Sequence, residues 1–231
     1  MSQTIIKLEN VGVRYRKRIG LGRGESHWAL RRVDMELKAG ESLGVIGRNG
    51  AGKSTLLQLL AGILAPDQGR LINHGVRVSL LALQLGFLPH LSGRDNVFLS
   101  GMLLGLRRRE IARRFDWIVE FSELGDRIDD PVHTYSAGMS ARLGFSIAFQ
   151  SSPDVLLIDE VLGVGDAPFR HKSATALRER ILARDHSVVL VSHDAQTIRQ
   201  LCDRAVWLVE GETRAIGPVD EVLERYDAES H

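Results

Sequence analysis

One eight-residue segment constrains the fold more than any other part of this sequence. Residues 47–54 read GRNGAGKS, which matches the pattern G-x-x-x-x-G-K-[ST] at every fixed position. The segment follows a run at 42–46 that we expect to be a strand, and it leads into a predicted helix at 53–60. Glycines let consecutive backbone N–H groups surround an anion, and the helix start adds partial positive charge. The sequence therefore predicts a phosphate-binding loop.

Two carboxylates end a second apolar run, which we expect to be a buried strand of a parallel sheet. Residues 155–158 read VLLI, and Asp159 and Glu160 follow directly. The last residues of such a strand reach the carboxyl edge of the sheet, where folds of this kind bind ligands. We expect Asp159 to hold Mg²⁺ and Glu160 to act as general base toward an attacking water. Without the phosphate loop, the pair would be equally typical of a solvated strand end.

His193 follows a further apolar run at 188–191, so its imidazole is expected at the same sheet edge, where it can hydrogen-bond a γ-phosphate. The other seven histidines are interpreted as ordinary surface or core residues. In the loop, Lys53 would reach the β- and γ-phosphates, Ser54 would hold Mg²⁺, and Thr55 would contact the α-phosphate. These residues together predict a site for a nucleotide's phosphates and Mg²⁺.

The composition excludes several classes of protein. The 231 residues include 30 Lys and Arg against 29 Asp and Glu, and the resulting net charge of +1 gives no overall attraction to nucleic acid. The single cysteine, Cys202, cannot form an internal disulfide. No stretch reaches the roughly 18 consecutive apolar residues that a membrane span requires. We expect a cytoplasmic protein that reaches a membrane only through a partner.

The order of the expected elements indicates an α/β protein. Strands are expected at 5–15, 33–37, 41–46, 76–83, 155–158, 188–191 and 205–209, and a mainly helical stretch at 89–150. Strands that alternate with helices favour a parallel sheet, here interrupted by a helical insertion. One helix of the insertion has an apolar face formed by Ile111, Phe115, Ile118 and Val119.

A further segment separates this sequence from other proteins with phosphate loops. Residues 135–139 read YSAGM and open an apolar helix. The segment resembles the signature motif of ABC-transporter ATPases, whose commonest form is LSGGQ. The resemblance covers essentially the whole chain, because Asp159 and Glu160 match the family's second nucleotide motif, Asp166 its D-loop aspartate and His193 its switch histidine.

The resemblance implies a fold and a division of the chain. The fold would be α/β, with a P-loop NTPase (RecA-like) core, an N-terminal antiparallel β portion and an inserted α-helical subdomain. Residues 1–231 would form one ABC ATPase domain, with 1–88 and 151–231 as its nucleotide-binding core and 89–150 as its helical signature subdomain.

The resemblance also implies a homodimer that encloses two molecules of ATP with Mg²⁺, because the signature serine and glycine of this family cap the γ-phosphate held by the partner subunit. The implied nucleotide contacts are Tyr15, Gly47, Arg48, Asn49, Gly50, Ala51, Gly52, Lys53, Ser54, Thr55, Ser136, Gly138, Asp159 and Asp166. The implied catalytic residues are Glu160, His193 and Gln84, and the implied metal ligands are Ser54, Asp159 and Gln84.

Two assignments remain open at this point. The family carries a glutamine before the helical insertion, and the expected position is nearer Leu83, one residue before Gln84. The aromatic residue that stacks on adenine is assigned to Tyr15, but His27 or Trp28 could share or replace it.

Three segments resemble the ATPases of polysaccharide exporters within this family, namely 85–97, 135–139 and 160–170. They imply export of a lipid-linked O-antigen, capsule or teichoic-acid chain through a separate integral membrane permease, with the ATPase at the cytoplasmic face of the inner (plasma) membrane. Some O-antigen members continue into a carbohydrate-binding domain; this chain ends at His231, so it resembles either the shorter capsule-type ATPases or a truncated form.

Other functions stay possible on the sequence alone. An importer or an exporter of lipid or peptide would share the same motifs. A soluble ABC ATPase acting on nucleic acid is disfavoured, because the basic stretches lack the interleaved aromatic residues that stack on bases. A small-molecule kinase would explain the phosphate loop but not the segment at 135–139.

Overall fold

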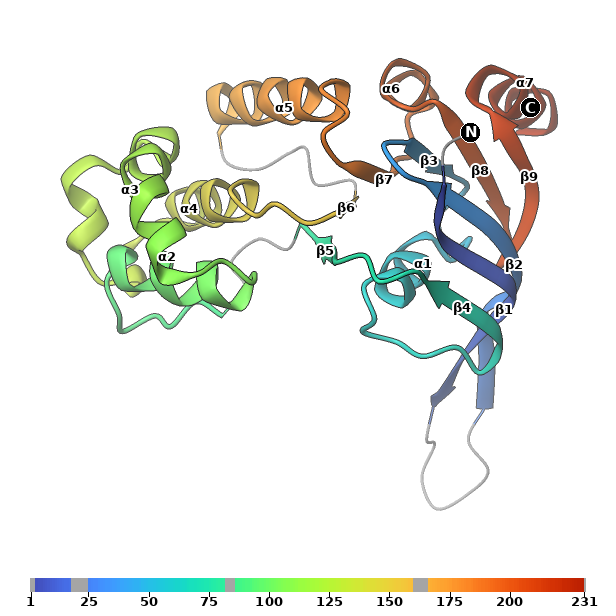
Figure 1. Cartoon of the computed structure of the whole chain (residues 1–231), viewed down its shortest axis with the longest axis horizontal. Coiled ribbons are helices and arrows are strands. Elements are labelled where there is room, and N and C mark those ends of the chain that lie inside the picture. Colours follow the sequence, from blue (N-terminus) through green and yellow to red (C-terminus); the bar gives the residue numbers. More distant parts are fainter. Residues whose placement is uncertain (1–2, 18–24, 82–85, 160–165, 231) are drawn as a thin grey trace. The chain divides into compact units, whose positions relative to one another are not determined.

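The computed structural model describes residues 3–17, 25–81, 86–159 and 166–230 (Figure 1). The chain forms two compact units. The first, here called the sheet unit, comprises Met1–Leu80, Pro153–Glu160 and Arg180–His231, and the second, the helical unit, comprises Leu81–Ser152 and Val161–Glu179. The predicted helical stretch at 89–150 lies in the helical unit, which also takes in part of the chain after β6.

One sheet organises the first unit. Among the described residues it has nine strands in the order β4-β1-β2-β9-β8-β3-β7-β6-β5. In chain order the strands are β1 (Thr4–Lys17), β2 (Glu25–Lys38), β3 (Ser42–Ile46), β4 (Gln68–Asn73), β5 (Val78–Leu80), β6 (Val155–Ile158), β7 (Ser187–Val191), β8 (Arg204–Val209) and β9 (Glu212–Pro218). Five neighbouring strands, β8, β3, β7, β6 and β5, are parallel to one another.

The parallel strands bring the predicted site segments to one edge of the sheet. Every residue of β3, β6 and β7 is buried, which is why these strands read as short apolar runs in the sequence. The register pairs Val45 with Val191 and Ile158 with Leu190. The segments that follow β3, β6 and β7 therefore begin side by side at the carboxyl edge.

The antiparallel part of the sheet lies at its other end. β1 pairs with both β2 and β4, and β9 pairs with β8. β1 and β2 confirm the predicted N-terminal antiparallel portion. β4 and β9 were not predicted, and β2 begins earlier than the expected strand at 33–37.

Helices cover both faces of the sheet unit (Figure 1). Helix α1 (Lys53–Leu60) packs Leu56 and Leu57 into the core that contains Val45 of β3. Gly44, which directly precedes Val45 in β3, faces the opposite side of the sheet, because successive residues of a strand alternate between its two faces. A Cβ on Gly44 would lie 2.5 Å from Ile198 Cγ2 of α6 (Ala195–Leu201), so glycine lets α6 approach the sheet closely. Helix α7 (Val219–Ser230) follows β9, and its Tyr226 ring meets the Trp207 ring of β8 edge-on.

The helical unit has a separate apolar core. Its helices are α2 (Gly93–Leu103), α3 (Arg108–Ser122), α4 (Ala137–Phe149) and the greater part of α5 (Ala167–Leu182), with short 3-10 turns at Gly125–Asp129 and Val132–Thr134. The predicted apolar face of α3 is confirmed, because Ile111 and Ile118 are fully buried in this core and Phe115 and Val119 pack against it. No helix in the described part of the chain combines the length and apolarity needed to cross a membrane.

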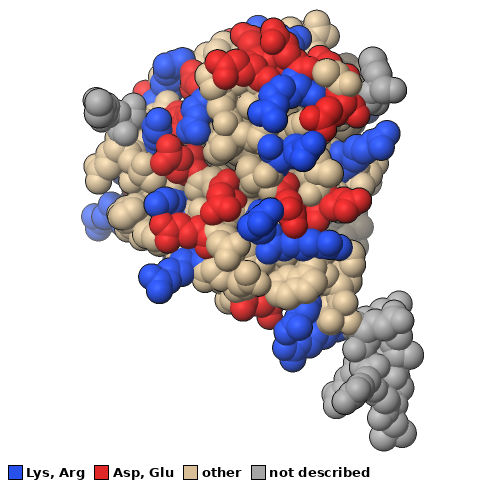
Figure 2. All heavy atoms as spheres, turned by 90° about the vertical axis from the view of Figure 1, so that its right-hand side faces the viewer, with Lys and Arg blue, Asp and Glu red and all other residues tan. Residues whose placement is uncertain are grey.

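Basic and acidic side chains are interspersed on the face of the molecule shown in Figure 2. This distribution is typical of a solvated surface, and on this face it gives a polyanion no continuous basic track.

Candidate nucleotide site

The phosphate loop is organised around Lys53, the first residue of α1. Its side chain turns back over the loop, where Nζ donates hydrogen bonds to Gly47 O at 2.7 Å and to Arg48 O at 3.2 Å. Lys53 is only 8% exposed, so these carbonyls hold an ammonium group that is largely removed from water. Lys53 is thereby held against the backbone of the phosphate loop, whose N–H groups are the donors that an anion site requires.

One glycine of the loop is required by geometry. Gly52 has φ +104°, and a Cβ there would lie 2.6 Å from Ala29 O of β2. Gly52 is also the N-cap of α1, and no side chain caps the helix. The first N–H groups of α1 therefore lack a side-chain cap, and they are suited to bind phosphate oxygens.

Two contacts that the sequence did not predict support the loop from below. Gly211, in the turn between β8 and β9, donates from N to Ala51 O at 3.0 Å. A Cβ on Gly47 would lie 2.4 Å from Leu208 O, so the loop passes directly over β8. Gly211 itself has φ +80°, and a glycine in a tight turn was the only sequence signal for this support.

Ser54 and Asp159 bring two oxygen atoms together beside the loop. Ser54 Oγ donates to Asp159 Oδ2 at 3.3 Å. Both line a cavity of about 240 Å³ whose other walls are His27, Ala29, Asn49, Gly50, Gly52, Lys53 and Thr55. Buried β6 delivers Asp159 to this position, as the sequence predicted for a strand end.

These two residues fit the role of Mg²⁺ ligands in a nucleotide site. Among the described residues, no group of three or more His, Cys, Asp or Glu could hold a metal ion. Mg²⁺ beside nucleotides typically takes one or two protein oxygens and fills its remaining positions with water and phosphate oxygens. The pairing of one hydroxyl with one carboxylate suits that mode of binding.

His193 lies at the same sheet edge, two residues after β7, and its side chain is exposed. The next residue, Asp194, is the N-cap of α6 and accepts hydrogen bonds from Gln196 N and Thr197 N. A hydrogen bond from the Thr197 hydroxyl is the largest cause that lowers the pKa of Asp194, and the two backbone N–H groups and nearby His193 add to it. An ionised cap therefore fixes the backbone directly after His193.

The three aromatic candidates for adenine differ in their surroundings. Tyr15 is 44% exposed and donates its hydroxyl to Gln58 Oε1 of α1 at 3.2 Å. Its cross-strand neighbour His27 lines the cavity beside the loop. The guanidinium carbon of Arg14, Cζ, lies over the Trp28 ring, 5.2 Å from the centroid of that ring. His27 is the candidate that shares a cavity with Lys53, and Tyr15 stands next to it on the strand pair.

In the helical unit, the predicted signature segment forms the start of α4. Ser136 is the N-cap of this helix, and its Oγ accepts from Met139 N at 3.1 Å. A Cβ on Gly138 would meet nothing closer than Ser136 Oγ at 3.8 Å, so this chain itself leaves open space there. Tyr135 is anchored by its hydroxyl, which donates to Arg127 O at 2.6 Å, and burial raises its pKa. The segment thus presents an exposed serine at the start of a helix, on a fixed base.

The remaining predicted residues fall in two groups. Asp166 lies in the helical unit, where Oδ1 accepts from Phe169 N at 3.1 Å and Oδ2 pairs with Arg142 at 3.4 Å. Gln84 and Glu160 lie outside the described residues. Lys53, Ser54, Asp159 and His193 belong to the sheet unit, whereas Ser136, Gly138 and Asp166 belong to the helical unit.

The phosphate loop, Asp159 and the parallel sheet define a phosphate-loop nucleotide-binding protein. The sequence profile of the ABC transporter family matches residues 30–163, which is more than half of the chain. The chain belongs to the ABC transporter family, as the motifs predicted, and it is an ATP-binding ATPase subunit of that family.

Several relatives carry more specific descriptions. The O-antigen export system ATP-binding protein RfbB of Klebsiella pneumoniae is 44% identical over 204 residues, which cover 88% of this chain and 82% of RfbB. The teichoic acids export ATP-binding protein TagH of Lactococcus lactis is 47% identical over 202 residues, which cover 87% of this chain but 42% of TagH. The chain therefore spans most of RfbB and less than half of TagH.

Solved structures confirm the predicted fold class. The dimeric ATP-binding cassette MJ0796, in a post-hydrolysis state with ADP and Pi, matches with a TM-score of 0.72 at 23% identity. The match covers 93% of this chain and 99% of that chain.

Proposed function

We propose that this chain is the nucleotide-binding subunit of an exporter that moves a lipid-linked cell-surface polysaccharide through a separate membrane subunit. The observation that carries the proposal is the 44% identity to an O-antigen export ATPase over 82% of that protein. The described site residues are compatible with it, because a buried lysine, a hydroxyl and a carboxylate converge beside the phosphate loop. The 47% identity to a teichoic acids export ATPase supports the same substrate class.

In the proposed reaction, the residues of the sheet unit hold and orient ATP. The N–H groups of the loop and of the first turn of α1 bind the phosphates, and Lys53 neutralises charge on the β- and γ-phosphates. Ser54 and Asp159 would hold Mg²⁺, which neutralises charge on the phosphate oxygens when it is bound. Glu160 takes the proton of the attacking water, and His193 hydrogen-bonds the γ-phosphate.

The second subunit completes each site. Ser136 and the N–H groups at the start of α4 would cap the γ-phosphate held by the partner, because a helix N-terminus favours an anion. The first turn of α4 carries no acidic residue that would repel phosphate. Two subunits would therefore close around two molecules of ATP and separate after hydrolysis.

Transport requires a membrane partner for this subunit. Met102 and Leu103 at the end of α2 are 48% and 56% exposed, and Leu88 nearby in the sequence is 40% exposed. These apolar side chains are suited to contact a permease segment, whereas Phe98 and Leu99 are partly buried within their own unit. Such docking would hold the chain at the cytoplasmic face of the plasma membrane.

The dimer is tested by light scattering of the Glu160→Gln variant with and without MgATP. We expect a shift from monomer to dimer that requires MgATP, because this variant should bind ATP without hydrolysing it. The double variant Glu160→Gln with Ser136→Ala should remain monomeric. ATP binding without any dimer, or full ATPase activity of Glu160→Gln, would contradict the proposed mechanism.

The substrate class is tested by deleting the gene in its source strain. We expect surface polysaccharide to disappear and lipid-linked glycan to accumulate inside the cell. The wild-type gene should restore export, and the Lys53→Ala gene should not. Unchanged surface polysaccharide in the deletion strain would refute export of this substrate class while leaving the ATPase assignment intact.

A further inference from the structure

Basic side chains gather where α3 begins in the helical unit. Residues 107–114 contain five arginines and one glutamate. Arg114 is half-buried and donates a hydrogen bond to Gln150 O. The other four are exposed and are here called the arginine cluster, namely Arg107, Arg108, Arg109 and Arg113. Three members of the cluster, all but Arg108, line a hollow of about 460 Å³ together with Glu110.

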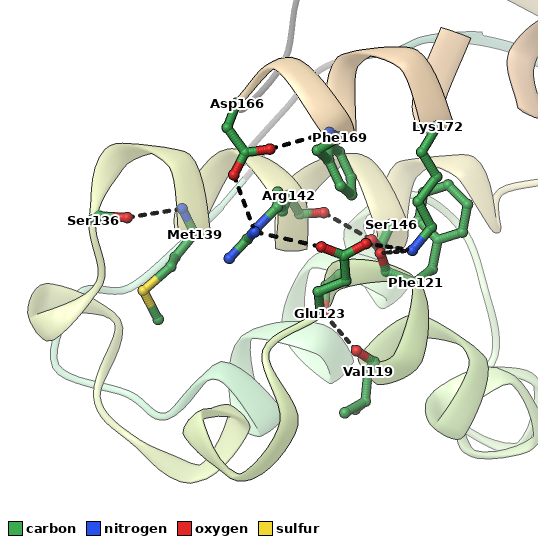
Figure 3. A network of polar contacts seen from close by, with 11 residues as sticks. Val119, Phe121, Glu123, Ser136, Met139, Arg142, Ser146, Asp166, Phe169 and Lys172 are labelled. Atoms are coloured by element: carbon green, nitrogen blue, oxygen red, sulfur yellow. Dashed lines mark hydrogen bonds and ion pairs between the residues drawn. The ribbon is translucent and has the colours of Figure 1, made fainter. Parts of the chain in front are cut away.

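Other cations of the helical unit are held by carboxylates (Figure 3). Arg142 Nη1 of α4 lies 3.4 Å from Asp166 Oδ2 and 3.6 Å from Glu123 Oε2. Lys172 Nζ of α5 lies 2.9 Å from Glu123 Oε1. These cations are neutralised by side chains of their own unit, so they offer little charge to an external partner.

The arginine cluster lacks such neutralisation. Within the described part of the chain, Arg109 and Arg113 form no ion pair and no hydrogen bond through their side chains. Glu110, the acidic residue of the hollow, is engaged at the start of the helix, where Oε2 accepts from Arg107 N at 2.7 Å and lies 3.5 Å from Arg107 Nε. Two exposed guanidinium groups of the cluster can therefore meet an anion from outside the chain.

The positions of these arginines oppose the stability of α3. The start of a helix carries partial positive charge, which disfavours cations there, and like charges four residues apart, such as Arg109 and Arg113, repel each other. The second half of α3 contains Asp116 and Glu120 and no basic residue, which reverses the charge order that the helix dipole favours. Stability of the fold does not explain the arginine cluster, whereas binding of an external anion does.

The arginine cluster directly follows apolar side chains that the proposed function assigns to the membrane subunit. Met102 and Leu103 end α2 and are 48% and 56% exposed. A tight turn leads from them to α3, with hydrogen bonds from Gly105 N to Met102 O at 3.0 Å and from Leu106 N to Gly101 O at 2.9 Å. Contact of Met102 and Leu103 with a permease would therefore bring the cluster close to the membrane.

We propose that the arginine cluster is a docking surface for the anionic phospholipid headgroups of the membrane at which this subunit works. The proposal rests on the proposed function only in that the latter places a membrane beside the chain. The exposed guanidinium groups supply positive charge and N–H donors to the headgroup phosphates. Because the whole chain has a net charge of only +1, a local cluster of this kind has to provide the attraction.

The test measures binding of the full-length chain to lipid vesicles by co-sedimentation. One set of vesicles contains phosphatidylcholine with about one-third phosphatidylglycerol, and the other contains phosphatidylcholine alone. The wild type is compared with the double variant Arg109→Gln/Arg113→Gln. The matched control is Arg70→Gln/Arg225→Gln, which removes the same charge from exposed arginines of the sheet unit. Thermal unfolding shows whether each variant is folded.

We expect the wild type to bind the vesicles with phosphatidylglycerol, to ignore those without it, and to bind less as salt is raised. Each arginine near an anionic surface contributes about fivefold to partitioning, so Arg109→Gln/Arg113→Gln should bind about 25-fold more weakly. The control pair should bind like the wild type. Arg109→Lys/Arg113→Lys should retain most of the binding, because the attraction depends on charge. The glutamine variant should be at least as stable as the wild type, because it removes repulsion.

The proposal is overturned if the wild type binds neither kind of vesicle, or binds both equally. It is also overturned if the control pair weakens binding as much as Arg109→Gln/Arg113→Gln, because net charge would then explain both. Calorimetric binding of inorganic phosphate that the glutamine variant loses, without vesicle binding by the wild type, would assign the cluster to a soluble anion instead. Failure of the proposed function is read separately, since the deletion strain would then keep its surface polysaccharide whatever the vesicles show.

Discussion

The hydroxyl of Ser54 lies 3.3 Å from Asp159 Oδ2, which joins the first turn of α1 to the end of β6 across 105 residues of sequence. Each of the two residues was predicted from its own motif, whereas the contact between their oxygen atoms depends on the folded parallel sheet. Because hydroxyl and carboxylate oxygens are suitable Mg²⁺ ligands, this contact locates the proposed metal position within the cavity beside the phosphate loop.

Asp159→Asn should weaken the binding of Mg²⁺ more than the binding of nucleotide. The substitution keeps the shape of the side chain but removes the negative charge. We expect the Mg²⁺ concentration for half-maximal ATPase activity to rise about tenfold or more, given the ~1.5–3 kcal/mol that contacts to charged groups contribute. Titration of Mg²⁺ at saturating ATP checks this.

The same strand offers a control for Asp159→Asn. Asp154 precedes β6, where it accepts hydrogen bonds from Arg77 N and Nε, and the bond from Arg77 N is the first cause that lowers its pKa. Asp154→Asn should lower stability modestly and leave the Mg²⁺ dependence unchanged. Equal shifts of the Mg²⁺ dependence in both variants would argue against a metal role for Asp159.

Lys53→Ala should reduce ATP affinity by about 100-fold or more, because it removes a buried cation from the phosphate position. The loss would be measured by calorimetric titration with MgATP. Lys38→Ala is a suitable control, since Lys38 is a partly exposed lysine of β2 whose partner Glu36 is 3.9 Å away. Unchanged ATP affinity in Lys53→Ala would contradict the proposed phosphate site.

The sequence predicted those parts of the fold that a motif or a buried apolar run marks locally. α1, β6 and β7 lie where they were expected, because a fully buried strand reads as an apolar run and a phosphate loop requires a helix after it. β4 and β9 escaped prediction because their residues are mostly exposed or half-buried. Their existence depends on pairing with β1 and β8, which no local pattern reveals.

The same limit applies to the site. Sequence motifs alone identified Lys53, Ser54 and Asp159, because the residue type at each of these motif positions indicates its chemical role. By contrast, Gly211 supports the loop through a hydrogen bond to Ala51, and Arg142 reaches Asp166 from another helix. These two contacts join residues far apart in the sequence, so they follow from tertiary packing alone.

Gly138→Ala should stabilise the fold while it impairs ATP-dependent pairing. Gly138 lies in the first turn of α4, and the nearest atom to an added Cβ is 3.8 Å away. Replacing glycine by alanine in a helix adds up to about 1 kcal/mol of stability. The methyl group would, however, occupy space that the proposed mechanism reserves for the partner's γ-phosphate.

Urea unfolding and light scattering, both applied to the Glu160→Gln background, separate these two effects of Gly138→Ala. We expect a higher unfolding midpoint together with a higher ATP concentration for half-maximal dimer. A variant that is more stable and still dimerises like its parent would show that no phosphate approaches this position.

The final prediction concerns Asp194, whose ionised side chain caps α6 directly after His193. Its pKa is lowered from the ordinary value of 3.8 in the folded state. A lowered folded-state pKa means that the ionised cap stabilises the protein above the unfolded-state pKa, and that this contribution is lost as pH falls through the folded-state pKa. Asp194→Ala should therefore cost about 1 kcal/mol at pH 7, and the difference from wild type should shrink below about pH 4.

Asp194→Ser separates the charge from the cap, because a serine hydroxyl can still accept from the N–H groups of the first turn. We expect Asp194→Ser to retain most of the neutral-pH stability and to lose the part that titrates in acid. Urea unfolding of the three proteins between pH 7 and pH 3 measures both effects. If Asp194→Ala and wild type lost stability in parallel down to pH 3, the Asp194 carboxylate would not be the group that titrates. The cap that Asp194 forms at the start of α6 would then not depend on its charge.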